Sequence, residues 1–382
     1  MQIFKVSDEG RLIMIILWYI ALTVLLFYGA KPCKKNTWNE ENMSLGQTKA
    51  FLGFCAIIVI FHHMAQFTCA SWLNPKYIRH GLDIFLTAGY PMVGVFFFCS
   101  GFGLYKSAKT KPDFFKRFLP VKILPILFST MLTTVVFIFF RLWRNIPLTI
   151  DSPVKVNGHD NWHPSIWFIP AIIVMYIFFY IGFGLFKKDW IGILIVALGT
   201  LGYIGFCIRF GYGRWWINTV HMFLAGILLA KYEDRVFESC KKYYVLKLII
   251  IIILCLVFYN LGNYKGGLYH FEVLYTLVFM SMYYLISMKL KIGNRALGFL
   301  GKITLEIYVT HVIFLHMFGY YMIHDGIKPV YYIENVSLYV LVCLALTIPV
   351  SYAISLADKK IGNALKQKGG AYEEAAIQRK YE

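Results

Sequence analysis

The sequence predicts an all-α polytopic membrane bundle of about eleven transmembrane helices. Hydrophobic residues make up 59% of its 382 residues and charged residues only 15%, whereas a soluble domain carries about 25% charged residues. Apolar stretches long enough to cross a bilayer as a helix recur along the whole chain. Because lipid cannot hydrogen-bond backbone groups, each stretch is expected to be helical. This pattern excludes disorder, fibrous repeats and almost every water-soluble enzyme.

Hydropathy places eleven candidate spans, with edges accurate to a few residues. They run over 12–30, 50–67, 89–105, 118–140, 165–186, 190–208, 215–230, 245–262, 270–288, 296–319 and 336–356. Pro120, Pro125 and Pro170 lie near span starts or mark kinks. The spans divide the chain into an N-terminal span with its loop (1–45), a membrane domain (46–356) and a basic tail (357–382).

The net charge of +18 is explained by membrane topology. Most of the 38 Lys and Arg residues fall in the loops after odd-numbered spans or in the tail. Positive charge collects on the cytoplasmic side of membrane proteins, so the C-terminus is expected inside and the N-terminus outside. The lipid bilayer is an expected partner of the protein, and no nucleic-acid partner is predicted. Cleavage of 12–30 as a signal sequence after Ala30 is an alternative, but it places Lys31, Lys34, Lys35 and Lys49 against this charge bias.

Cysteines and loop histidines give no metal site. The eight cysteines contain no C-x-x-C pair and mostly lie in apolar runs. His159, Asp160 and His163 lie in a predicted outer loop, where H-x-x-x-H would bind a metal only on a helix. Gly158 and Pro164 favour a loop there, so no metal is predicted.

Two adjacent histidines, His62 and His63, end the second span. Ionisable groups inside a membrane span are costly and often functional. Successive helical positions point about 100° apart, so the two rings face different surroundings. His63 lies about 21 Å along a helix from Lys49, in the predicted outer half of the membrane. One histidine of the pair is expected to be an interfacial anchor or a core residue bonded to a carbonyl, and the other is a candidate functional residue.

The tenth span contains Glu306, Tyr308 and His311. Tyr308 and His311 share a helix face, whereas Glu306 lies about 140° from His311. A buried carboxylate must pair or protonate. Lys302 offers a partner one turn earlier, so a structural ion pair is the alternative to a catalytic Glu306. His221 of the seventh span is predicted to be a hydrogen-bonded core residue.

Five segments match a known signature in order and spacing. They are residues 96–102 (F-F-F-C-S-G-F); 52–63, ending at His63; 115–125, with K-R and K-I-L-P; 167–170 (W-F-I-P) with Tyr176, together with 223–226 (F-L-A-G); and 300–304 (L-G-K-I-T) with Tyr308 and His311. The chain resembles the acyltransferase-3 family of integral-membrane O-acyltransferases, and the resemblance covers residues 46 to about 356.

The resemblance implies a ten-helix core, to which residues 12–30 add an N-terminal span. It further implies an enzyme of the cell membrane that moves an acyl group, expected to be acetyl. The donor is cytoplasmic acyl-CoA, a substrate and not a bound cofactor. The acceptor is a hydroxyl of an extracytoplasmic glycan or a related molecule. A histidine suits this chemistry, because a sugar hydroxyl needs a general base and the unperturbed pKa of histidine is near 6.5.

The residue patterns and the resemblance together give the expected site residues. The expected catalytic residues are His63, Glu306 and His311. The expected acyl-CoA-binding residues are Lys49, Ser100, Lys106, Arg117, Lys122 and Tyr308. Two positions depart from the family pattern, since Leu52 replaces an arginine eleven residues before His63 and Gly94 replaces an acidic residue. Lys49, about one turn below Leu52, is expected to supply the missing charge.

Two other classes remain open from the sequence. A multi-pass transporter or glycan exporter could use the same histidines and Glu306 as a proton relay. A catalytically silent partner of an envelope complex would need none of them. Release of CoA thiol in membranes distinguishes an acyltransferase from a transporter, whereas loss of His63 without effect would favour the silent partner.

Overall fold

The computed structural model describes residues 8–145, 166–263, 269–319 and 330–381. Twelve α-helices lie in these residues, which confirms the predicted all-α bundle. In chain order they are α1 (Asp8–Phe27), α2 (Leu45–Gln66), α3 (Gly89–Thr110), α4 (Leu124–Trp143), α5 (Phe168–Phe179), α6 (Asp189–Arg209), α7 (His221–Lys241), α8 (Tyr244–Asn263), α9 (Tyr269–Ser287), α10 (Arg295–Leu300), α11 (Thr304–Phe318) and α12 (Val336–Tyr381).

Short elements join or extend these helices. Two π-helical turns, η3 (Leu119–Ile123) and η4 (Tyr180–Gly184), continue into α4 and out of α5. Single 3₁₀ turns are η1 (Pro75–Tyr77), η2 (Asp83–Phe85) and η5 (Arg214–Trp216). The strands β1 (Lys31–Pro32) and β2 (Leu290–Lys291) form a two-residue antiparallel pair that ties the segment after α1 to the segment after α9.

Five of the described helical segments are long and apolar enough to cross a membrane. They are Leu45–Gln66, Leu119–Trp143, Asp189–Arg209, Tyr244–Gly262 and Val336–Lys360. Three shorter apolar helical segments, Ile15–Phe27, Phe168–Gly184 and Thr304–Phe318, pack among them. The arrangement is that of a multi-pass membrane protein, in which the exposed leucines and isoleucines of α8 face lipid.

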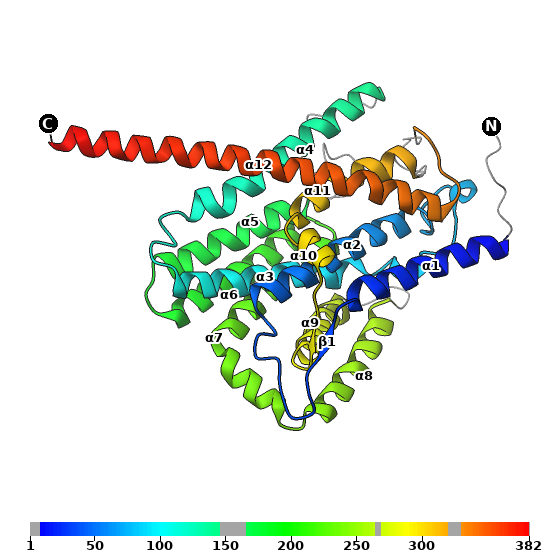
Figure 1. Cartoon of the computed structure of the whole chain (residues 1–382), viewed down its shortest axis with the longest axis horizontal. Helices are drawn as coiled ribbons and strands as arrows, with labels where there is room; N and C mark the ends of the chain where they lie inside the picture. The colour runs from blue at the N-terminus through cyan, green and yellow to red at the C-terminus, as the bar shows by residue number, and fades with distance from the viewer. Residues whose placement is uncertain (1–7, 146–165, 264–268, 320–329, 382) are drawn as a thin grey trace.

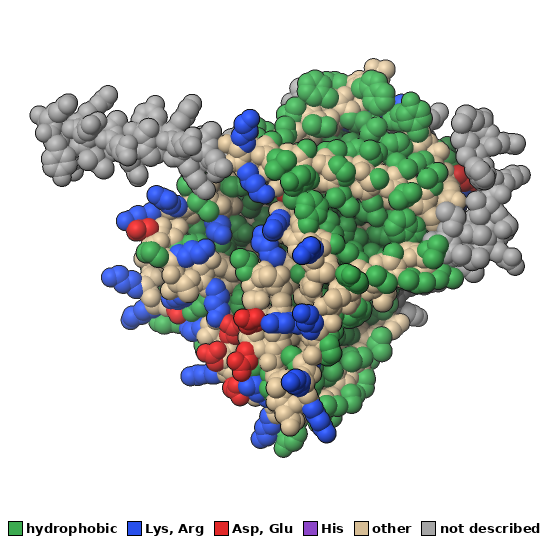
Figure 2. Space-filling view, viewed as in Figure 1, with side chains coloured by type: hydrophobic (Ala, Val, Ile, Leu, Met, Phe, Trp, Pro, Cys, Tyr) green, Lys and Arg blue, Asp and Glu red, His purple; other side chains and the backbone are tan. Residues whose placement is uncertain are grey.

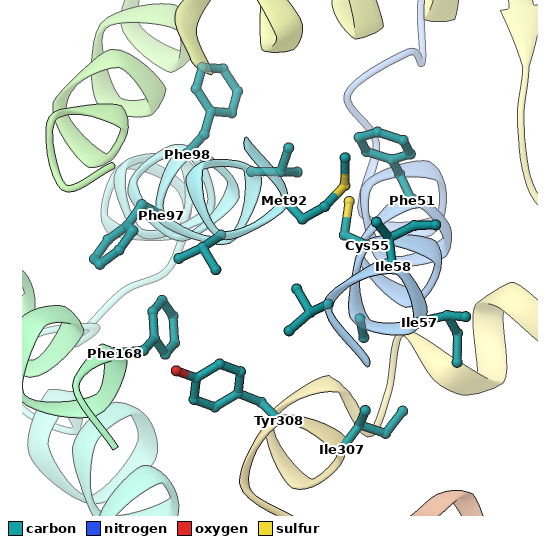
Figure 3. Close-up of a cluster of buried hydrophobic side chains, with 14 of the residues drawn as sticks. Phe51, Cys55, Ile57, Ile58, Met92, Phe97, Phe98, Phe168, Ile307 and Tyr308 are labelled. Atoms are coloured by element: carbon teal, nitrogen blue, oxygen red, sulfur yellow. The ribbon is translucent and has the colours of Figure 1, made fainter. Parts of the chain in front are cut away.

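Helices α2 and α3 form the centre of the bundle (Figure 1). Most of α2 is buried, including Ile60, Phe61 and Met64. Side chains of α2 and α3 meet Phe168 of α5 and Tyr308 of α11 in one hydrophobic cluster (Figure 3). The buried centre therefore brings together segments more than 200 residues apart in the chain.

Glycines allow α3 and α7 to touch along their backbones. A Cβ atom on Gly101 would lie 2.0 Å from the Phe223 carbonyl oxygen, and one on Gly226 would lie 2.0 Å from the Phe98 carbonyl oxygen. Any larger side chain would force the helices apart. The S-G-F and F-L-A-G segments found in the sequence thus pack against each other.

The predicted continuous span 296–319 is wrong, because the chain forms two helices there. Helix α10 ends at Leu300, a turn follows, and α11 begins at Thr304. Gly301 lies in this turn, and a Cβ atom on it would lie 2.0 Å from the Lys49 carbonyl oxygen. Gly53 of α2 is equally close to α10, since its Cβ would lie 2.5 Å from the Leu297 carbonyl oxygen. The break therefore allows a close approach of α10 and the turn to α2.

The bundle has two chemically different ends. We call the end where α2 begins and α3 finishes the basic end, and the opposite one, where α2 finishes and α3 begins, the histidine end. Lys and Arg side chains gather over one side of the molecule, while hydrophobic side chains cover most of the rest of the same view (Figure 2). At the basic end, Lys106 pairs with Glu233 and Lys109 pairs with Asp189.

Candidate active site

His63 and His311 form a buried pair at the histidine end. The Nδ1 atom of His63 lies 2.6 Å from the Nε2 atom of His311, within hydrogen-bond distance. The two rings are nearly parallel, with centroids 4.9 Å apart. His311 is fully buried and His63 is partly exposed. The structure therefore joins two of the three predicted catalytic residues.

Hydrogen bonding fixes the direction of this pair. Nδ1 of His311 lies 2.9 Å from the Ile307 carbonyl oxygen, which can only accept, so His311 donates there. In a neutral imidazole the other nitrogen accepts, so Nε2 of His311 takes a hydrogen from Nδ1 of His63. The lone pair of His63 is then on Nε2, which makes no hydrogen bond within the described residues. A nitrogen with an available lone pair can act as a general base.

Glycine packing explains why the two histidines meet. Gly53 and Gly301 hold α2 against the α10–α11 turn, as described above. Each glycine lies ten residues before one of the histidines, about 15 Å along a helix. Helices that touch at the glycines and run in the same direction therefore bring His63 and His311 to the same depth.

His62 is held apart from this pair. Its Nδ1 atom donates to the Phe85 carbonyl oxygen at 2.9 Å. Its ring lies against Gly89, where a Cβ atom would come within 2.2 Å of it. The loop that contains Phe85 is held in place by Asp83. Burial raises the pKa of the Asp83 carboxyl, but the Gly81 N–H and His80 lower it more, so this pKa lies below its usual value. The prediction that the adjacent histidines face different surroundings is confirmed.

Aromatic rings line the approach to the pair. The Tyr308 ring lies 6.1 Å from that of His311 and 5.2 Å from that of Phe168. Figure 3 shows the Tyr308 hydroxyl pointing toward Phe168 and α5. Phe168 in turn lies 5.0 Å from Phe97 of α3. The wall beside the histidines is thus apolar except for the phenol.

Glu306 lies at a different helix interface of the bundle. Its side chain is buried next to Ser355 and Asp358 of α12. Asp358 also accepts a hydrogen bond from Ser129 of α4 at 3.2 Å. Glu306 and Lys302 are both described and form no ion pair with each other. The structure places Glu306 among polar groups between α11, α12 and α4, away from the paired histidines.

The predicted donor-binding residues at the basic end differ in whether an acidic side chain lies beside them. Lys122 of η3 lies near enough to Lys49 of α2 and to Lys111 for their like charges to interact. None of these three has a carboxylate partner among the described residues. Lys106 differs, because Glu233 neutralises it. Arg117 is exposed and lies near Asp113.

Ser100 lies deeper, beside the hydroxyl of Tyr176 on α5. The sequence did not connect these two residues. His221 lies at the start of α7 with both ring nitrogens buried. The backbone of Val273 in α9 interacts with its ring, in line with the predicted core histidine. His159, Asp160 and His163 fall outside the described residues.

No cluster of metal-binding side chains is found in the part of the chain that the structure describes. The site is instead a pair of histidines inside a helical bundle of membrane type. Lys49, Lys111 and Lys122, which have no carboxylate partner among the described residues, lie at the opposite end of the bundle. A family model described as an acyltransferase domain matches residues 51–356. The chain belongs to the acyltransferase-3 family and is an acyltransferase of membrane type. No curated protein and no solved structure matches it.

Proposed function

We propose that the protein transfers an acyl group, acetyl in the simplest case, from cytoplasmic acyl-CoA to a hydroxyl of an extracytoplasmic glycan or related acceptor. The observation that carries this proposal is the directed pair of His63 and His311. It leaves one accessible basic nitrogen in an otherwise apolar site. Such a nitrogen suits deprotonation of a hydroxyl in the transition state.

The acceptor hydroxyl oxygen attacks the thioester carbonyl carbon while Nε2 of His63 takes the hydroxyl proton. The carbon–sulfur bond breaks, and the proton passes from His63 to the sulfur of CoA. During the step His63 carries a positive charge, which His311 stabilises by accepting the Nδ1 hydrogen. His311 is thus a positioning residue, and His63 is the catalytic one.

The two substrates are proposed to approach from opposite ends. Lys49, Lys111 and Lys122 share the basic end and have no acidic partner within the described part of the chain. CoA phosphates form charge-assisted hydrogen bonds with such ammonium groups. Lys49 lies about 21 Å along α2 from His63, a span that the extended arm of CoA must bridge. Lys49 also supports the proposed replacement of the family arginine, which is Leu52 here.

The test is release of CoA thiol by membranes that contain the protein. We expect release with the wild-type chain and loss to background with His63→Ala. His62→Ala is the matched control, because the same helix carries it and its ring faces the Phe85 carbonyl. It should retain most of the activity. A wild-type protein that moves a solute without releasing CoA would instead support the transporter class.

A further inference from the structure

A long groove lies between α5 and α6 and is not used by the proposed chemistry. Its volume is about 440 Å³. Val174 and Phe178 of α5 form one wall, and Gly202 and Phe206 of α6 form the other. Its lining is almost entirely apolar. An aliphatic chain would bury its methylenes there favourably.

The groove runs along the helices from the histidine end. Pro170 and Phe178 both line it, and they are about 12 Å apart along a helix. Trp216 and Tyr212 close its outer part, with ring centroids 4.7 Å apart. Tyrosine and tryptophan are suited to the border between an apolar region and water. A molecule with a polar group beside Trp216 and Tyr212 and an apolar chain between α5 and α6 would match both parts of the groove.

A series of ring contacts leads from this groove to the catalytic pair. Trp216 lies 6.3 Å from Trp167 between ring centroids, and Trp167 lies 6.2 Å from Phe168. Phe168 contacts Tyr308, which lies beside His311. The mouth of the groove and the histidines are therefore joined by one continuous aromatic wall.

We propose that this groove holds the hydrocarbon chain of a lipid-anchored glycan acceptor, with its sugar at the Trp216 end. The inference rests on the proposed function, since it names the class of acceptor for the same site. A chain in the groove lies parallel to the helices and leaves the sugar beside the aromatic wall that leads to His63. An acceptor anchored in this way reaches the base without leaving the membrane.

Two glycines of α6 provide a matched pair of variants. A Cβ atom on Gly202 or on Gly205 would have no neighbour within 4 Å, so both positions accept a larger side chain without a clash. Only Gly202 lines the groove. Gly202→Leu should fill the groove, whereas Gly205→Leu should not. Leucine also favours the helix more than glycine does, so both variants should fold.

The probe is dodecyl glucoside with a photoreactive diazirine on its alkyl chain, added to purified protein in phospholipid nanodiscs. We expect crosslinks on peptides of α5 and α6 that include Phe178 and Phe206, and competition by unlabelled dodecyl glucoside. Gly202→Leu should reduce this labelling about tenfold, the factor for losing burial of about two methylenes. Gly205→Leu should leave it unchanged.

Several outcomes would overturn the proposal. Labelling spread evenly over lipid-facing helices such as α8, or unaffected by Gly202→Leu, would mean that ordinary membrane lipid fills the groove. Labelling needs no turnover, so His63→Ala should label like the wild type. Loss of groove labelling alongside His63-dependent CoA release would therefore reject only the groove. Absence of CoA release with intact labelling would reject only the acyl transfer.

Discussion

Nδ1 of His63 and Nε2 of His311 are 2.6 Å apart, although 248 residues separate them in the chain. The Ile307 carbonyl at the other side of His311 fixes which nitrogen donates. The hydrogen bonds of the pair therefore all point one way: His63 donates to His311, His311 donates to the Ile307 carbonyl, and Nε2 of His63 keeps its lone pair. This geometry makes distinct predictions for the two histidines.

His311→Ala should slow CoA release about a hundredfold without changing the apparent affinity for acyl-CoA, because the base loses its orientation and its charge stabilisation. His311→Gln, which can place an oxygen near the lost Nε2 atom, should recover part of the rate. In a double variant with His63→Ala the two losses should not add, since both residues act through one nitrogen. Rates measured against acyl-CoA concentration test this.

The control for this series is His316→Ala, which removes a second buried histidine of α11 that contacts the rings of Phe67 and Phe137. It should affect stability more than rate. Additive losses in the double variant, or a raised KM for acyl-CoA in His311→Ala, would contradict the positioning role.

Gly301→Ala should impair both stability and activity. The new Cβ atom would lie 2.0 Å from the Lys49 carbonyl oxygen, and backbone on both sides cannot yield. Overpacking of this kind costs about 1–3 kcal/mol, and the shift of α2 would also separate His63 from His311. We expect a lower melting temperature of the purified protein and a large loss of CoA release.

Gly298→Ala is the matched control, because it lies in α10 and its Cβ would meet no atom within 4 Å. It should be neutral or slightly stabilising, by up to about 1 kcal/mol. If the two variants behaved alike, the close contact between Gly301 and α2 would not be what positions the histidines.

Lys49→Ala and Lys122→Ala should each weaken donor binding. Loss of one charge-assisted hydrogen bond costs about 1.5–3 kcal/mol, or roughly ten- to hundredfold in apparent acyl-CoA affinity. Arg117→Ala should have a smaller effect, since this side chain is exposed and lies near Asp113. The measurement is the dependence of CoA release on acyl-CoA concentration.

Lys291→Ala serves as the comparison, because Lys291 lies at the same end but pairs with Glu41 at 3.0 Å. Its removal should not change donor affinity. If CoA release by the Lys49 and Lys122 variants depended on acyl-CoA concentration as in the wild type, these lysines would not bind the donor and would only set the membrane topology.

The sequence was sufficient to predict most helices and the individual histidines. Apolar length is a strong signal when every span must be helical, and an ionisable residue in such a span stands out. The family motifs added the order of the segments. Each of these signals is local, or depends only on spacing along the chain.

What the sequence could not give is the contact between distant segments. Nothing near His63 indicates that its partner is His311, although Gly53 and Gly301 carry a signal in their equal ten-residue spacing. Hydropathy also cannot detect the break between α10 and α11, because one charged residue in a three-residue turn, Lys302, hardly changes the mean over a window as long as a membrane span. Glu306 faces α12, and no local sequence pattern predicts how α12 packs against α11.

Loop labelling in intact cells should show on which side of the membrane each end of the bundle lies. Lys76 is exposed in η1 at the histidine end, and Asp113 is exposed after α3 at the basic end. The charge bias predicts that the basic end is cytoplasmic. With the partly exposed Cys33, Cys99 and Cys240 replaced by serine, a membrane-impermeant maleimide should label Lys76→Cys directly and Asp113→Cys only after permeabilisation. The reverse pattern would place His63 toward the cytoplasm, and the acceptor and CoA would then have to exchange sides.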